Sequence, residues 1–305
     1  MKLITILGPT ATGKTKLATH LANKLNGEII SADSRQVYKG MDIGTGKDLK
    51  EYNIETNQIP YHLINIVDAG YEYNVFEFQR DFRKAYQEIT ERGNTPILCG
   101  GTGMYLEAAL SDEDIVEVPQ NIELRDILKN KNIKELKNIL TSIKNIHNST
   151  DTIDLNRVIR AIEIATHKVD FPELYQKSKP IESTIIGVNV ERFLIRRKIT
   201  ERLTHRLKNG MIEEVQALLD KGLKPEQIKF YGLEYKFVTQ YILGEINREK
   251  LSIFLNTAIH QFAKRQMTWF RRMEKNGAKI NWIDGSLNEE EKIKITMDII
   301  SKDTN

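Results

Sequence analysis

The chain of 305 residues is long enough to bury a full hydrophobic core and, at about 100 to 200 residues per domain, predicts one large domain or two smaller ones. Its 45 basic and 42 acidic side chains nearly balance, so total charge does not require a nucleic-acid partner, and only local clustering of charge can indicate one. The single cysteine, Cys99, excludes an internal disulfide and a cysteine-rich zinc site and is typical of a reducing compartment. No apolar run has the length of a signal-peptide core or a membrane span, so we expect a cytoplasmic protein with no membrane partner.

The first elements along the chain predict a phosphate-binding loop. Residues 3–7 form an apolar run typical of a short buried strand, and residues 16–25 have the spacing of a helix. Between them, residues 8–15 (GPTATGKT) match G-x-x-x-x-G-K-[ST] in the strand, loop and helix order that this pattern requires. Backbone N–H groups, the helix dipole and the Lys14 ammonium favour a bound polyphosphate, with the Thr15 hydroxyl as a Mg2+ ligand. The residues expected at this phosphate site are Gly8, Thr10, Ala11, Thr12, Gly13, Lys14 and Thr15.

Later strands and helices predict an α/β fold with a central parallel sheet flanked by helices, as in P-loop NTPases. Residues 28–32 read as a strand that ends at Asp33, which places this carboxylate at the carboxyl edge of the sheet. Two further strands are predicted over residues 95–99, which include Cys99 as a buried residue, and over residues 184–188. Between the strands of residues 28–32 and 95–99, residues 75–92 have helical periodicity, with candidate buried positions at Phe76, Phe78, Phe82, Ala85, Tyr86 and Ile89.

The polar, helix-like stretch of residues 111–183 predicts a helical insertion domain in a core built from residues 1–110 and 184–305. From Phe193 onward the pattern is almost entirely helical, with turns at residues 222–225, Gly244 and Gly277.

Nucleotide kinases and NTPases commonly carry such a loop, so phosphoryl transfer from ATP is one function to weigh. However, a Walker-B segment would end in an acidic residue after the strand of residues 95–99, and this strand is instead followed by Gly100-Gly101-Thr102. The acidic residue follows the second strand. The sequence also lacks a clear adenine-binding signature. A small-molecule kinase therefore stays as an alternative.

Five blocks carry a resemblance to a known family. They are residues 8–15, 31–45 (SADSRQVYKGMDIGT), 100–105 (GGTGMY), 156–163 (NRVIRAIE) and 261–271 (QFAKRQMTWFR). In this order they resemble the bacterial tRNA dimethylallyltransferases over most of the chain. The resemblance implies transfer of a dimethylallyl group from dimethylallyl diphosphate to N6 of adenosine 37, beside the anticodon, with release of diphosphate. It implies tRNA, through its anticodon stem-loop, and dimethylallyl diphosphate as partners, and we expect a monomer.

The resemblance also implies catalytic roles. It makes Asp33 the general base for the exocyclic amine, although a carboxylate at a strand end can instead serve a nearby Mg2+ or cap a helix. It places Thr102 near donor and tRNA, with a simple turn residue as the alternative. In the family, paired arginines reach the diphosphate, so the resemblance implies this role for Arg202 or Arg206. Compared with the family, however, this sequence is shortened between these arginines and Gly210.

Several residues are expected to contact tRNA. Residues 190–210 contain seven basic side chains against two acidic ones, and a second basic cluster over residues 264–275 surrounds Trp269 and Phe270. A solvated helix with its aromatic rings in the core is the alternative interpretation. The histidines, including His147, match no metal-ligand spacing. The resemblance assigns tRNA contacts to Asp33, Ser34, Arg35, Gln36, Thr102, Arg125, Asn156, Arg157, Val158, Ile159 and Arg160.

A related adenylate isopentenyltransferase that acts on free AMP would share the loop and the base. The basic C-terminal region favours tRNA over a mononucleotide, because AMP requires no such extended surface.

Overall fold

The computed structural model of the chain describes residues 2–143 and 154–304; His147 and the other residues of 144–153 lie outside that description. The chain forms two compact units, one of Met1–Ser111 with Pro180–Asn305 and one of Asp112–Lys179. Each unit is described by itself.

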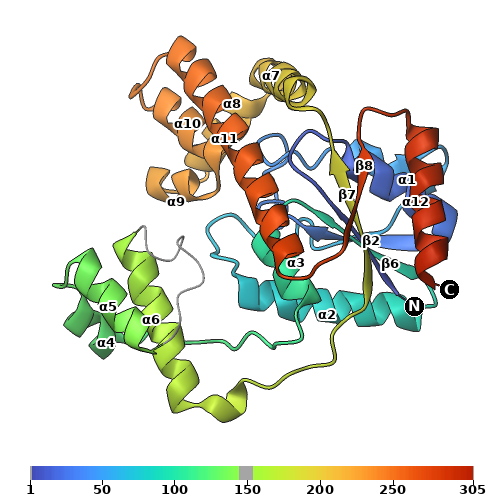
Figure 1. Cartoon of the computed structure of the whole chain (residues 1–305). Helices are drawn as coiled ribbons and strands as arrows, with labels where there is room; N and C mark the ends of the chain where they lie inside the picture. The colour runs from blue at the N-terminus through green and yellow to red at the C-terminus, as the bar shows by residue number, and fades with distance from the viewer. Residues whose placement is uncertain (1, 144–153, 305) are drawn as a thin grey trace. The chain divides into compact units, whose positions relative to one another are not determined.

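A six-stranded, fully parallel sheet forms the centre of the first unit, in the order β5-β2-β6-β1-β7-β8 (Figure 1). The four strands expected from the sequence are present, and Cys99 is buried in the third of them, as predicted. The strands are β1 (Leu3–Leu7), β2 (Gly27–Ala32), β5 (Tyr61–His62), β6 (Thr95–Gly100), β7 (Ser183–Asn189) and β8 (Ile280–Asp284).

Strand β8 corrects the prediction that residues after Phe193 are almost entirely helical. The segment Ile280–Asp284 pairs in parallel with β7, with Trp282 opposite Gly187. A Cβ atom on Gly187 would lie 2.4 Å from the Trp282 ring, so the indole occupies the space above this glycine. This pairing joins positions almost a hundred residues apart in the sequence. The five residues of β8 therefore carry little local evidence of a strand.

Helices cover both faces of the sheet because strand side chains alternate between them. One face buries Ile6, Ile97 and Ile186 against α1 (Lys14–Leu25) and α12 (Glu289–Thr304), which lie side by side in Figure 1. The other face packs against α2 (Val75–Glu91), which in turn contacts α3 (Gly103–Leu110). In α2 the predicted positions Phe78, Phe82, Ala85 and Ile89 are buried, whereas Phe76 and Tyr86 are only half-buried.

Short elements occupy the stretch between β2 and α2. They are η1 (Leu49–Tyr52) and the two-stranded ribbon β3 (Asn53–Ile54) and β4 (Asn57–Gln58).

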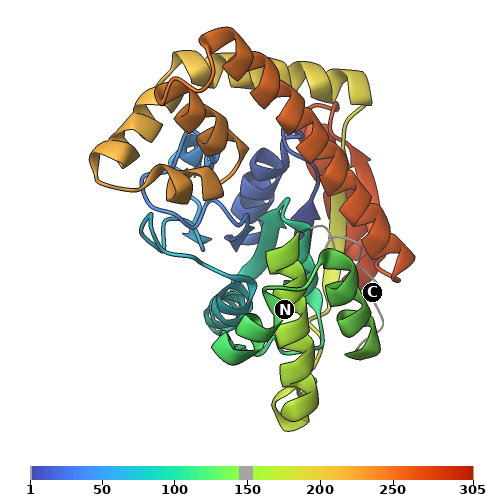
Figure 2. The ribbon, with the colours of Figure 1, turned by 90° about the vertical axis from the view of Figure 1, so that its left-hand side faces the viewer.

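Five helices follow β7 and pack on one another (Figure 2). The turns predicted at Gly222, Gly244 and Gly277 are confirmed, since each glycine follows a helix end with a positive φ. The helices are α7 (Arg192–Lys208), α8 (Met211–Asp220), α9 (Pro225–Phe230), α10 (Leu233–Ile242) and α11 (Arg248–Lys275).

The second unit is helical and has its own core, in which Leu136, Leu140, Val158 and Ile162 are buried. Within residues 2–143 and 154–304, no helix combines the length and the apolar character needed to span a membrane. The elements of this unit are α4 (Ile122–Leu128), α5 (Ile133–Ile143), α6 (Leu155–Asp170) and η3 (Pro172–Leu174).

A buried carboxylate ties the start of β2 to its neighbours. Glu28, 4% exposed, accepts hydrogen bonds from Arg92 Nε at 3.0 Å, Asn94 Nδ2 at 2.7 Å and His62 Nε2 at 2.7 Å. Burial alone would raise the pKa of Glu28, but these hydrogen bonds outweigh burial and lower it to about 2.

We expect Glu28→Gln to destabilise the fold by about 2 kcal/mol at pH 7, because charge-assisted hydrogen bonds are lost. The folded pKa lies below the ordinary value of 4.5, so the stabilisation is present above that value and is lost as the pH falls toward 2. Urea unfolding between pH 7 and pH 3 should show the gap between wild type and variant closing. Glu88→Gln, in an exposed ion pair with Lys84, is the control. A gap independent of pH would contradict this account.

Candidate functional site

The loop between β1 and α1 has the backbone of a phosphate-binding loop. Gly13 adopts φ 84°, a left-handed conformation that glycine accepts without strain, and Ala11 adopts φ 65°. A Cβ atom on Gly8 would lie 2.4 Å from the Val188 carbonyl oxygen, so strand β7 passes too close for any other residue. The Thr12 hydroxyl donates to the Pro9 carbonyl at 2.9 Å and closes the loop from within.

Lys14 supplies a partly desolvated positive charge at this loop. Its ammonium donates to the Pro9 carbonyl at 3.2 Å, which folds the half-buried side chain over the loop. Burial lowers the pKa of Lys14, the nearby Cys99 and Asp33 oppose this shift, and the Arg202 guanidinium reinforces it. A bound anion would stabilise the charged lysine, so the site favours a negatively charged ligand.

The two candidate arginines of α7 have different environments. Arg202 Nη2 donates to the hydroxyl of Thr10 in the phosphate-binding loop. Arg206 instead donates to Asp48 Oδ2 at 3.3 Å. Its guanidinium also packs against Gly46, because a Cβ atom on this glycine would lie 2.5 Å from Arg206 Nη2. Burial and the charge of Arg206 lower the pKa of Arg202 to about 10, which leaves it protonated at neutral pH. Arg202 is therefore the better placed of the two to reach a phosphate on the loop.

The segment that carries Asp48 is held by a carboxylate. Glu214 accepts hydrogen bonds from the backbone N–H groups of Asp42, Ile43 and Gly44 at 2.7, 2.7 and 2.9 Å, and from the Tyr235 hydroxyl at 2.6 Å. Because α8 positions Glu214, this contact fixes the path of the chain toward Arg206.

Sequence reasoning missed Glu234, which lines a cavity of about 10 Å3 together with Arg202 and Arg206. Burial raises the pKa of Glu234, and the two arginines oppose this shift. An acid two residues after Gly232 carries no pattern of its own, so only the fold reveals its position.

Asp33 and Thr102 come together at the carboxyl ends of β2 and β6. Asp33 Oδ1 accepts a hydrogen bond from the Arg35 N–H at 2.9 Å, so it stabilises a turn rather than capping a helix. Thr102 Oγ1 accepts from the Ser34 N–H at 3.1 Å, and its own N–H donates to the Ala32 carbonyl at 3.2 Å. Within the described part of the chain Asp33 Oδ2 accepts no hydrogen bond, which leaves this oxygen for a ligand.

Gln266 joins the two halves of the site, a role that the sequence did not indicate although this residue lies in the block of residues 261–271. Its Oε1 accepts from the Thr10 N–H at 2.9 Å, and its Nε2 donates to the Gly101 carbonyl at 2.9 Å. The side chain is 8% exposed, and a Cβ atom on Gly101 would lie 2.4 Å from Nε2. The side-chain amide of Gln266 therefore bridges the phosphate-binding loop and the loop that carries Thr102, and it sets the distance between them.

The residues after Asp33 have different surroundings. Gln36 and Arg35 are both half-buried, and Gln36 Oε1 accepts a hydrogen bond from the Ser31 hydroxyl at 3.0 Å.

In the helical unit, two candidate arginines share one carboxylate. Arg125 Nε donates to Glu163 Oε1 at 2.7 Å, and Arg160 Nη1 donates to Oε2 at 3.1 Å. Burial alone would raise the pKa of Glu163, but hydrogen bonds from Arg125, the Asn121 N–H and Arg160 lower it to about 2. Both guanidiniums are thus held in place.

The remaining candidates lie in the adjoining turn of α6, and they differ in exposure. Asn156 and Arg157 are exposed. Val158 and Ile159 are buried in the core of the helical unit, where hydrophobic periodicity directs them, so their side chains face other helices rather than solvent.

The basic cluster on α11 is partly solvated and partly packed. Lys264, Arg265, Arg271 and Lys275 are exposed. Arg272 donates to Glu107 at 2.7 Å and lies 4.0 Å from the centroid of the Trp269 ring, whereas Phe270 is fully buried. For Phe270, the interpretation as a core aromatic is confirmed.

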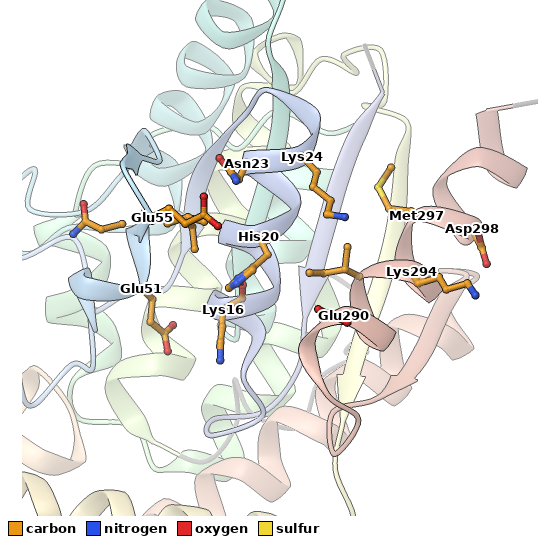
Figure 3. A pocket seen from close by; sticks show the side chains of 13 residues that line it. Lys16, His20, Asn23, Lys24, Glu51, Glu55, Glu290, Lys294, Met297 and Asp298 are labelled. Atoms are coloured by element: carbon orange, nitrogen blue, oxygen red, sulfur yellow. The ribbon is translucent and has the colours of Figure 1, made fainter.

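A pocket of about 1050 Å3 lies elsewhere, on the outer side of α1 (Figure 3). Its labelled side chains come from α1, α12 and the segment of residues 51–55, and they carry charges of both signs. None of the expected site residues lines this pocket.

Residues 36–273 match the sequence model of the IPP transferase family. The chain belongs to this family. The match confirms the resemblance drawn from the five sequence blocks, and the P-loop NTPase-like fold is confirmed by solved structures of other family members.

Among curated relatives, the IPP transferase chain is 56% identical over 301 residues to tRNA dimethylallyltransferase 1 of Parabacteroides distasonis, with 98% of each chain covered. It is 55% identical over 291 residues to tRNA dimethylallyltransferase 2 of Bacteroides fragilis, with 95% of each chain covered.

Two solved structures are similar over almost the whole chain. A tRNA isopentenylpyrophosphate transferase from Bacillus halodurans has a TM-score of 0.71 at 32% identity and covers 99% of this chain and 96% of its own. A eukaryotic dimethylallyltransferase acting on tRNA has a TM-score of 0.81 at 25% identity, with 99% and 80% covered.

We expect Gln266→Leu to raise the Kd for inorganic diphosphate about tenfold, because the Thr10 N–H and the Gly101 carbonyl lose their partner and the loop loses its support. Calorimetric titration of the folded variant measures this change. Gln261→Leu, on an exposed position of the same helix, should leave the Kd unchanged. Equal affinities of wild type and Gln266→Leu would show that the bridge does not support the phosphate site.

Proposed function

We propose that this IPP transferase moves the dimethylallyl group of dimethylallyl diphosphate to N6 of adenosine 37 in tRNA and releases diphosphate. The observation that carries this proposal is the bridge through Gln266, which sets a phosphate-binding loop beside the loops of Asp33 and Thr102. A leaving-group site and a proton acceptor thereby share one edge of the sheet. The names of the curated relatives agree with this reaction.

The diphosphate is the leaving group, and it lies on residues 8–15, where backbone N–H groups and the α1 dipole favour an anion. Lys14 and Arg202 neutralise the charge that develops as the allylic C–O bond breaks. Both cations are partly desolvated, so their attraction to the leaving group exceeds that of exposed side chains.

Mg2+ fits this site through Thr15. The Thr15 side chain is half-buried in the first turn of α1, and its hydroxyl forms no hydrogen bond with the residues that the structure describes. Mg2+ commonly takes one or two protein oxygens and completes its shell with phosphate oxygens and water, so a single hydroxyl suffices. When bound, the ion adds further neutralisation of the departing diphosphate.

Asp33 acts as the general base. As the bond from N6 to the allylic carbon forms and the C–O bond breaks, the N6 proton passes to the carboxylate, whose Oδ2 is available. Thr102 holds the Ser34 N–H and so positions the Asp33 turn, and its hydroxyl faces the same edge.

For tRNA we propose contacts through Ser34 and Arg35 in the first unit and through Asn156 and Arg157 in the helical unit. Arg125 and Arg160 present guanidiniums already oriented by Glu163. Val158 and Ile159 are left out of this set because they are buried. A monomeric state and a cytoplasmic location stay predictions.

The reaction is tested by incubating the protein and Mg2+ with labelled dimethylallyl diphosphate and either unmodified tRNA or AMP. We expect label in the tRNA alone. Label found only in AMP would favour the adenylate isopentenyltransferase, and turnover of ATP with no transfer of label would favour a kinase.

We expect Asp33→Ala to reduce transfer to tRNA by about 100- to 10,000-fold, the range for a lost general base, while the Kd for the donor stays nearly unchanged. Single-turnover rates and a donor titration separate the two effects. Asp68→Ala removes an acid that is 81% exposed and serves as the control. Unchanged turnover of Asp33→Ala would remove Asp33 from this role.

A further inference from the structure

An exposed aromatic ring that contacts Arg35 has no role in the reaction described so far. Phe230, the last residue of α9, is 54% exposed. Its ring centroid lies 5.3 Å from the guanidinium carbon of Arg35, within cation–π distance. The backbone N–H of Arg35 in turn donates to Asp33 at 2.9 Å. The exposed ring thus contacts the guanidinium of a residue whose backbone belongs to the turn of the candidate proton acceptor.

Buried aromatic residues fix the Phe230 ring in place. It packs edge-on against Tyr231, with centroids 6.2 Å apart and an interplanar angle of 74°. Tyr231, 2% exposed, packs edge-on against the fully buried Tyr38 at 4.6 Å, and its hydroxyl accepts a hydrogen bond from the Gly70 N–H at 2.5 Å. The ring is therefore solvent-exposed but already ordered, so little entropy is lost when a ligand covers it.

Single exposed aromatic residues are common on protein surfaces and usually require no functional explanation. Phe230 differs in three respects, because it is paired with an arginine, it packs edge-on against a buried aromatic ring, and its arginine belongs to the turn that Asp33 stabilises. Aromatic rings and arginine planes are the surfaces on which proteins stack unpaired RNA bases. Among described residues, Phe193 is more exposed still, at 68%, but it is not part of such a group.

We infer that Phe230 and Arg35 form a stacking platform for the base next to adenosine 37 in the anticodon loop. This inference rests on the proposed function. When an enzyme takes a target base out of its stack, the neighbouring base loses a stacking partner, and a fixed ring can replace that partner. Every base has a π-face, so the platform contributes affinity for an unstacked loop rather than sequence selectivity.

The first test measures binding of an anticodon stem-loop by the full chain. Phe230→Ala should raise the Kd by about 5- to 100-fold, as for a lost base–aromatic contact. Phe230→Leu should weaken binding similarly, since it keeps an apolar side chain without a π-face, whereas Phe230→Trp should retain affinity. The Kd for the prenyl donor should stay unchanged in all three. Phe254→Ala, at a phenylalanine of α11 that is 45% exposed and outside the candidate tRNA contacts, is the control, with no expected effect.

The second test identifies the contacted base. Two stem-loops are compared, each with one abasic nucleotide, either before or after adenosine 37. The stem-loop that lacks the contacted base should bind wild type more weakly than the intact stem-loop. With that stem-loop, Phe230→Ala should bind no more weakly than wild type. Equal affinity of wild type and Phe230→Leu for the intact stem-loop would overturn the platform. So would a Phe230→Ala penalty that persists with both abasic stem-loops. Transfer of label by the wild type tests the proposed function separately, so either idea can fail without the other.

Discussion

The site depends on the register of three parallel strands. Leu7 of β1 and Ala32 of β2 both pair with Gly100 of β6, so the phosphate-binding loop, the Asp33 turn and the Thr102 loop leave the sheet at one level. A Cβ atom on Gly100 would lie 2.2 Å from the Ala32 carbonyl oxygen, so glycine is required for this approach. Because a shift of one residue would invert every side chain of a strand, the buried faces of the sheet protect the alignment of the site.

Two desolvated cations, Lys14 and Arg202, act on each other at this edge. Lys14 and Arg202 are both partly desolvated, and two of the acids that act on them have contacts of their own: Asp33 holds a turn, and Asp48 engages Arg206. Glu234 offsets part of the charge from the side of α10. Lys14 and Arg202 therefore repel each other, and an anionic ligand would relieve that repulsion.

The sequence predicted what depends on local pattern, namely the loop between β1 and α1, four of the strands, the helix over residues 75–92 and the glycine turns. The expected insertion, residues 111–183, corresponds to a compact unit of Asp112–Lys179. Strand β8 was not predicted, since its evidence is the distant β7. Gln266 and Glu234 were missed because their partners lie in other elements, and the choice between Arg202 and Arg206 required the position of Asp48.

Glu163 affects how strongly binding of a polyanion to the helical unit would depend on ionic strength. The carboxylate already neutralises one of the two guanidiniums that it holds, so Arg125, Arg160 and Glu163 together present a net charge of +1. Binding of nucleic acid depends on ionic strength through the number of phosphates that cations neutralise and the counterions that are released. This triad would therefore count as about one cation in that dependence, while its two oriented donor forks supply geometry that one mobile lysine could not.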